Sequence, residues 1–167
     1  SGTSGKNYLS LPADAFKNVG NAGFTVSMWV KCSSSTSEQS VLFEAKNSAD
    51  KSMIPAAALH VGGYGAFRDE NFSVASTEGL APDSNTWNLI TLTMTPAGIT
   101  VYINGEVRST DTRALTNVLT AENMAKINDV RVGSGTLFAS QDVVNASIDN
   151  VDIYSAPLSA SEIAAKY

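Results

Sequence analysis

The stretch from Trp87 to Val107, WNLITLTMTPAGITVYINGEV, constrains the fold of this chain more than any other segment. Apolar and polar residues alternate along two arms joined by a Pro-Ala-Gly connection, and many are β-branched or aromatic, as in half-buried strands. Asn104-Gly105 then provides the two positive-φ positions that a two-residue turn requires. The pattern predicts a β-hairpin with one apolar face toward a core. The opposite face of the hairpin comprises Thr91, Thr93 and Tyr102.

Short segments with the same alternation, separated by turn-forming residues, lie on both sides of this hairpin. We predict strands at 8–11, 24–31, 41–45, 57–61, 72–75, 130–132 and 147–154. Residues 62–71, GGYGAFRDEN, form a predicted Gly-rich loop. Thr120 to Lys126 is a candidate helical turn, and the capping-box spacing from Ser159 to Glu162 predicts a short C-terminal helix.

These elements predict an all-β sandwich with a short C-terminal helix. The chain has 167 residues, no internal repeat and no visible second domain, so we expect a single domain over residues 1–167. Within it, residues 1–5, SGTSG, are expected to be a linker or a remnant of cloning.

Composition excludes several partners. The net charge is -5 and the 11 Lys and Arg residues are scattered, which excludes nucleic acid and anionic membranes as the main partner. No apolar run approaches the roughly 20 residues that span a bilayer, so no membrane insertion is expected. Cys32 is the only cysteine; it cannot form an internal disulfide and is predicted to be a small buried side chain. A charged fraction of 16%, with many Ser, Thr, Asn and Gly, is typical of a module that is secreted or held at the cell surface.

Four segments carry a resemblance to a known family. In order they are FTVSMWVK (24–31), WNLITLTM (87–94), VYINGEV (101–107) and ASIDNVDIYSAPLSASEI (146–163). Together they resemble the laminin-G-like, concanavalin A-like lectin/glucanase superfamily, which includes modules attached to bacterial polysaccharide-degrading enzymes. The resemblance implies a jelly-roll β-sandwich of two antiparallel sheets. It also implies binding of glycan or protein at the concave face or its rim loops, often with a bound calcium ion.

The acidic residues argue against an enzyme. Glucanases of this fold carry a Glu-x-Asp-x-x-Glu arrangement on one strand, and retaining hydrolysis needs two carboxyls about 5–5.5 Å apart. No such run exists here, and the acidic clusters at Asp69-Glu70 and at Asp149 with Asp152 have another spacing. His60 is the only histidine, and alternation places it opposite the apolar side chains of its strand, as a surface or hydrogen-bonded residue. We therefore expect a module without catalytic activity.

Sugar recognition generally needs an aromatic face and a few directed polar groups. The candidate ligand-binding residues combine the 62–71 loop with outward-facing strand positions: Tyr64, Phe67, Arg68, Asp69, Glu70, His60, Trp29 and Tyr102. A structural interpretation stands beside each of them. Trp29 and Tyr102 could form a second small core beneath a covering loop, and Arg68 with its acidic neighbours could be a solvated turn.

Asp149 is the candidate metal ligand. It shares its parity in SIDNVDIY with Val151 and Ile153, so we expect it to face the core. A carboxylate there is costly unless it is paired, hydrogen-bonded or bound to a metal. Two alternatives follow: a structural calcium ion, with carbonyls of the loop from Asn18 to Gly23 as further ligands, or a carboxylate that caps backbone N–H groups. The resemblance implies calcium, because the matching Asp often helps to hold an ion.

Two functional hypotheses remain. The first is a non-catalytic carbohydrate-binding module of a larger exported glycan-active or cell-surface protein, whose partners are a polysaccharide or glycan and the other domains of the parent protein. The second is an adhesion or structural spacer domain that binds protein or no ligand. An exposed aromatic pair near Arg68 favours the first hypothesis, and a concave face filled by the chain's own loops favours the second.

Overall fold

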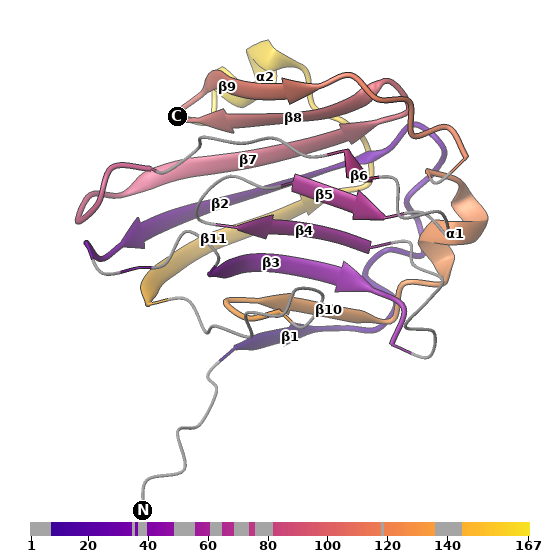
Figure 1. Cartoon of the computed structure of the whole chain (residues 1–167), viewed down its shortest axis with the longest axis horizontal. Helices are drawn as coiled ribbons and strands as arrows, with labels where there is room; N and C mark the ends of the chain where they lie inside the picture. Colours follow the sequence, from indigo (N-terminus) through magenta and orange to yellow (C-terminus); the bar gives the residue numbers. More distant parts are fainter. Residues whose placement is uncertain are drawn as a thin grey trace, which may run out of the picture.

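The computed structural model describes residues 8–34, 36, 40–48, 82–117, 119–135 and 145–167, together with the backbone of 56–60, 65–68 and 74–75. In these ranges the chain forms two antiparallel sheets (Figure 1). One sheet comprises β1 (Leu9–Leu11), β3 (Val41–Lys46), β4 (Ala56–His60), β5 (Gly65–Arg68), β6 (Val74–Ala75) and β10 (Asp129–Val132). The other comprises β2 (Phe24–Cys32), β7 (Asn88–Thr95), β8 (Gly98–Ile103), β9 (Glu106–Asp111) and β11 (Ala146–Tyr154).

The strand order in the six-stranded sheet is β1-β10-β3-β4-β5-β6, and in the five-stranded sheet it is β11-β2-β7-β8-β9. Two short helices, α1 (Ala121–Ala125) and α2 (Ala160–Ala164), complete the described elements. Neither of them is long and apolar enough to cross a membrane. The strands predicted from alternation are present, with ends that differ by one or two residues.

The hydrophobic core lies between the two sheets and follows the alternation of β2. Its fully buried residues from this strand are Phe24, Val26, Met28 and Val30. Val26 pairs with Leu92 on β7, which pairs with Val101 on β8, so the three strands present one continuous apolar surface. Cys32 at the end of β2 is buried, as predicted.

The predicted hairpin is confirmed as β7 and β8. Asn104 and Gly105 have φ values of +54° and +81°, the two left-handed positions that the sequence predicted at the following turn. The Asn104 side chain also fastens the turn, because its Oδ1 accepts a hydrogen bond from the Leu89 N–H at 2.9 Å. The turn that leads into β9 is therefore tied to the start of β7.

Helix α1 closes one end of the sandwich (Figure 1). Thr120 caps it as predicted, since its side chain accepts a hydrogen bond from the Asn123 N–H, and Met124 is fully buried. The Asn21 Oδ1 accepts a second hydrogen bond from the Ala121 N–H at 2.7 Å. The loop before β2 is thus fixed to the helix.

The C-terminal segment 155–167 packs over the outer face of β2 in the five-stranded sheet. The Leu158 N–H donates to Thr25 Oγ1 at 2.8 Å, Ile163 of α2 is fully buried, and the Tyr167 ring lies 6.1 Å from the Trp29 ring. The predicted capping box of Ser159 holds the start of the helix. Beneath the segment lie polar residues that are buried on this face: Thr25, Ser27, Thr91, Thr93 and Tyr102.

The prediction for residues 62–71 is wrong. Residues 62–71 were expected to form a loop, but Gly65–Arg68 is the strand β5 and pairs with β4. The tetrapeptide Gly-Ala-Phe-Arg has no alternation of its own that predicts a strand. Backbone hydrogen bonds to a neighbouring strand, which depend on tertiary register, create β5.

We predict that Ile163→Ala lowers the free energy of unfolding by about 2–5 kcal/mol, because it leaves a cavity between α2 and the sheet. Urea denaturation followed by tryptophan fluorescence measures the loss, since Trp29 lies under the same segment. The exposed control Ala165→Ser should change the value by less than about 0.5 kcal/mol. Equal stabilities for both variants would show that the C-terminal segment does not pack on the sheet.

Candidate functional site

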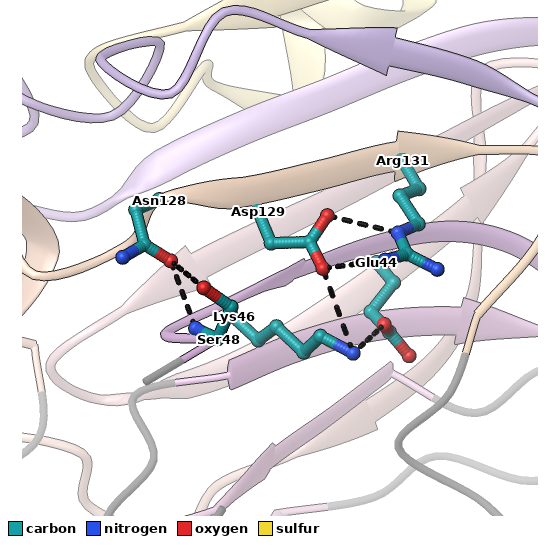
Figure 2. A network of polar contacts seen from close by, with 6 residues as sticks. All are labelled: Glu44, Lys46, Ser48, Asn128, Asp129 and Arg131. Atoms are coloured by element: carbon teal, nitrogen blue, oxygen red, sulfur yellow. Dashed lines mark hydrogen bonds and ion pairs between the residues drawn. The ribbon is translucent and has the colours of Figure 1, made fainter. Parts of the chain in front are cut away.

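The outer face of the six-stranded sheet carries a network of charged side chains from two adjacent strands (Figure 2). In the register of β10 against β3, Arg131 pairs with Glu44 and Asp129 pairs with Lys46. The alternate residues of both strands, Val130 and Ala45 among them, are buried in the core. Alternation therefore places all four charges on the outer face, and we call this set the charged network.

The contacts within the charged network are short. Arg131 donates two parallel hydrogen bonds to Asp129, from Nε and from Nη2, each at 2.8 Å. The Lys46 Nζ lies 3.0 Å from Glu44 Oε1 and 3.7 Å from Asp129 Oδ2, so it connects the two carboxylates. The hydrogen bond to Asp129 raises the pKa of the Arg131 guanidinium, against the opposing effect of burial. Two positive and two negative groups thus compensate each other.

Glu44 is the most buried member of the charged network, with 0% of its surface exposed although it lies on an outer face. The segment after β10 packs over it: a Cβ atom on Gly135 would lie 2.6 Å from Glu44 Oε2. A carboxylate in such a place is costly unless a cation and hydrogen bonds compensate it. Lys46 provides this cation, and the absence of a side chain at Gly135 leaves room for the carboxylate.

Polar and aromatic groups extend the network on both sides. The Arg131 guanidinium carbon lies 4.9 Å from the centre of the Tyr8 ring, which is 44% exposed. At the other side the Asn128 Oδ1 accepts hydrogen bonds from the Ser48 N–H at 2.8 Å and from its hydroxyl at 2.9 Å (Figure 2). An exposed aromatic ring beside planar polar groups is the combination that sugar recognition uses.

Three predicted ligand residues lie on strands of this same sheet: His60 on β4, and Phe67 and Arg68 on β5. Arg68 pairs with Ala56, which pairs in turn with Lys46, and His60 pairs with Val41. The side chains of His60, Phe67 and Arg68 fall outside the described residues, as do Tyr64, Asp69 and Glu70 entirely. Their contact with a ligand stays a prediction.

A family model matches residues 3–164 of the chain and describes the concanavalin A-like lectin/glucanases superfamily. The chain belongs to this superfamily. Its two antiparallel sheets and short helices confirm the predicted jelly-roll sandwich. No functionally curated protein matches the chain in sequence.

Solved structures share this superfamily fold at low identity. Domain 4 of AbnA, an extracellular arabinanase from Geobacillus stearothermophilus in complex with arabinotriose, is 18% identical with a TM-score of 0.61, and the match covers 95% of this chain and 71% of that one. The NanB sialidase from Streptococcus pneumoniae is 15% identical with a TM-score of 0.69, covering 96% and 26%. The binding domain of botulinum neurotoxin serotype C1 is 19% identical with a TM-score of 0.61, covering 98% and 41%. This superfamily member therefore spans about a quarter of the sialidase and less than half of the toxin domain.

The structure separates Trp29 and Tyr102 from the charged network. Both lie on the outer face of the other sheet, where Trp29 is half-buried against Tyr167 and Tyr102 is only 7% exposed. This arrangement matches the alternative interpretation, a second small core beneath a covering segment. Their role as ligand contacts stays a prediction.

The prediction that Asp149 faces the core is wrong. Its partner in β2 is Trp29, an outward residue, and Asp149 is exposed. The register shifts between Asp149 and Asp152, and Asn150 has a φ of +48°, so a β-bulge inserts one residue and reverses the alternation. Val151 and Ile153 still pack against the core, as expected.

Without burial, the physical argument for a metal at Asp149 disappears. Its Oδ1 accepts a hydrogen bond from the Asn150 N–H at 2.8 Å, within the bulge itself. The described residues contain no group of three or more His, Cys, Asp or Glu side chains that could hold an ion. The burial argument for an ion at Asp149 is therefore lost, and the predicted calcium ion stays a prediction.

We predict that Lys46→Met lowers the free energy of unfolding by about 3 kcal/mol, because it removes the cation beside a buried carboxylate. Chemical denaturation measures the loss. Adding Glu44→Gln to this variant should recover part of the stability, since the uncompensated charge is then gone. A double variant no more stable than Lys46→Met would contradict the coupling, and the exposed control Lys126→Met should change stability by about 0.5 kcal/mol or less.

A second prediction concerns Asp149. The melting temperature of Asp149→Asn should respond to calcium and to a chelator in the same way as that of the unchanged chain, because the Asp149 carboxylate is exposed and already accepts the Asn150 N–H. Differential scanning calorimetry in both conditions measures the four melting temperatures. A calcium-dependent stabilisation that Asp149→Asn abolishes would restore the metal site.

Proposed function

We propose that the chain is a non-catalytic carbohydrate-binding module of a larger exported glycan-active or cell-surface protein. The charged network beside the exposed Tyr8 carries this proposal. The Arg131 guanidinium lies over the Tyr8 ring, and the exposed part of that ring can take the C–H surface of a sugar, while Arg131 and its partner Asp129 provide a donor and an acceptor for hydroxyl groups. The network holds these groups in place before a ligand arrives, which reduces the entropy lost on binding.

The matched structures support a module that works within a larger protein. Domain 4 of the arabinanase was solved with arabinotriose, a neutral oligosaccharide. The part of the sialidase that matches this chain makes up only 26% of the sialidase. A binding module of this kind would keep its parent near a polysaccharide and raise the local concentration of substrate by multivalent attachment. The proposed location is therefore extracellular, with other domains of the parent protein as neighbours.

The arrangement of the Asp129 and Glu44 carboxylates supports the non-catalytic part of the proposal. Glycoside hydrolysis needs one carboxyl that donates a proton to the leaving group and a second that attacks or activates water. Asp129 accepts two hydrogen bonds from Arg131, and Glu44 is buried beside Lys46. Asp129 is engaged by Arg131, and Glu44 is closed to a substrate. The proposal therefore assigns them to binding and to structure.

One observation favours the alternative function of an adhesion or spacer domain. The C-terminal segment covers the outer face of β2 in the five-stranded sheet, which closes that part of the face to a glycan. The six-stranded sheet then holds the proposed glycan site, and its failure to bind any sugar would leave the spacer function in place.

The test is a glycan array of plant, host and microbial glycans, followed by calorimetric titration of the best binder. We expect binding to at least one glycan, with and without a chelator. Both Tyr8→Ala and Arg131→Ala should weaken it by about tenfold or more, corresponding to about 1.4 kcal/mol. The chain alone should release no reducing sugar from the glycan that it binds.

The matched control is Arg113→Ala, because Arg113 also binds an aspartate two residues before it, Asp111, but lies just after β9 of the other sheet. This variant should bind glycan like the unchanged chain. Loss of binding to the same extent in all three variants, or no binding to any glycan, would refute the proposed site.

A further inference from the structure

A separate pocket of about 240 Å³ opens at the end of the five-stranded sheet. It lies where β7 begins and where the turn at Asn104 leads from β8 into β9, beside the residues Pro82 and Asp83 that precede β7. Its lining shares no residue with the charged network, which is on β3 and β10. The pocket therefore constitutes a second, independent surface feature.

Two asparagine side chains brace the pocket. The Asn104 Nδ2 donates to Asn88 Oδ1 at 3.2 Å, and the Asn88 Nδ2 donates to the Asp83 carbonyl at 2.9 Å. The Asn104 Oδ1 accepts from the Leu89 N–H at 2.9 Å. These bonds connect the turn, the start of β7 and the loop before it. The pocket is consequently braced, and each of the two asparagine oxygens already accepts one hydrogen bond.

The remaining polar groups of the pocket have no partner in the described part of the chain. Asp83, Glu106 and Arg108 are all exposed and line the pocket, yet none of them forms a side-chain hydrogen bond or ion pair with a described residue. Beside them, Val107 is 57% exposed and supplies an apolar surface. Two carboxylates and one guanidinium thus stand around a preformed hollow, with their donors and acceptors available.

We propose that this pocket is a second ligand site and that it takes a single ring of a neutral, hydroxyl-rich sugar. Its volume is below the roughly 300–1,000 Å³ of pockets for drug-sized ligands, which limits it to a ligand of about one ring. A carboxylate accepts hydrogen bonds from sugar hydroxyls and a guanidinium donates to them, so charges of both signs suit a polyol.

The charges also select against other ligands. Asp83 and Glu106 outnumber Arg108, which disfavours an acidic sugar such as a sialic or uronic acid. A metal ion is disfavoured as well, because the guanidinium repels it and the amide oxygens of Asn88 and Asn104 already accept hydrogen bonds. The ligand class is therefore neutral. The inference shares the glycan chemistry of the proposed function but not its site.

The test is a titration of the isotope-labelled chain with arabinotriose, cellotriose and N-acetylneuraminic acid, followed by two-dimensional NMR. Side-chain amide signals separate the two sites, since Asn88 and Asn104 report the pocket and Asn128 reports the charged network. We expect at least one neutral trisaccharide to shift the Asn88 and Asn104 signals in a saturable way. N-acetylneuraminic acid should leave those two signals unchanged at the same concentration.

Two variants test the assigned groups. Glu106→Gln and Arg108→Ala should each weaken binding, raising the dissociation constant measured from the Asn88 and Asn104 signals by about tenfold, or about 1.4 kcal/mol. The control Glu122→Gln, an exposed glutamate on α1, should leave it unchanged. The inference is overturned if neither neutral sugar moves the pocket signals, if the acidic sugar moves them equally, or if the variants bind like the control. Shifts at Asn128 alone would support the proposed function and refute this second site.

Discussion

The fold depends on three strands, β2, β7 and β8, that are buried on both faces. β2, β7 and β8 bury an apolar set against the opposite sheet, and their other face is buried too, although it carries Thr25, Ser27 and Thr91. The hydroxyls of Ser27 and Thr91 lie 2.8 Å apart, and Thr25 accepts a hydrogen bond from the Leu158 N–H. Buried hydroxyls need such partners, since an unsatisfied polar group costs about 1–3 kcal/mol. The C-terminal segment is therefore part of the fold, because it covers and satisfies this face.

That requirement decides which surfaces remain for a ligand. With β2, β7 and β8 buried on both faces, the described residues gather charged side chains at two places, the other side of the sandwich and the strand ends. The charged network occupies the first place, and the pocket at the turn of Asn104 occupies the second. The exposed charges at the pocket follow from the cost of burying a charge. The charged network, in which Glu44 is fully buried, is tolerated because its two cations and two carboxylates compensate each other.

The sequence predicts well where the determining contacts are local. The turn at Asn104-Gly105 and the capping box of Ser159 each depend on residues within three positions, and both are present. The orientation of Asp149 could not be predicted, because the bulge at Asn150 interrupts the alternation on which the inference rested. Asparagine is enriched among non-glycine residues at positive φ. The Asp-Asn pair was therefore a weak signal for a bulge.

The charged network was missed for a different reason. Glu44 and Lys46 are two residues apart, as are Asp129 and Arg131, so each pair is visible as alternate charges on an otherwise apolar strand. What joins the pairs is the antiparallel register of β3 with β10, across more than eighty residues of sequence. Local patterns state which face of a strand a charge occupies, but only the sheet order states which strand lies beside it. The charged network therefore depends on the strand order of the sheet, because its residues come together only when β10 lies between β1 and β3.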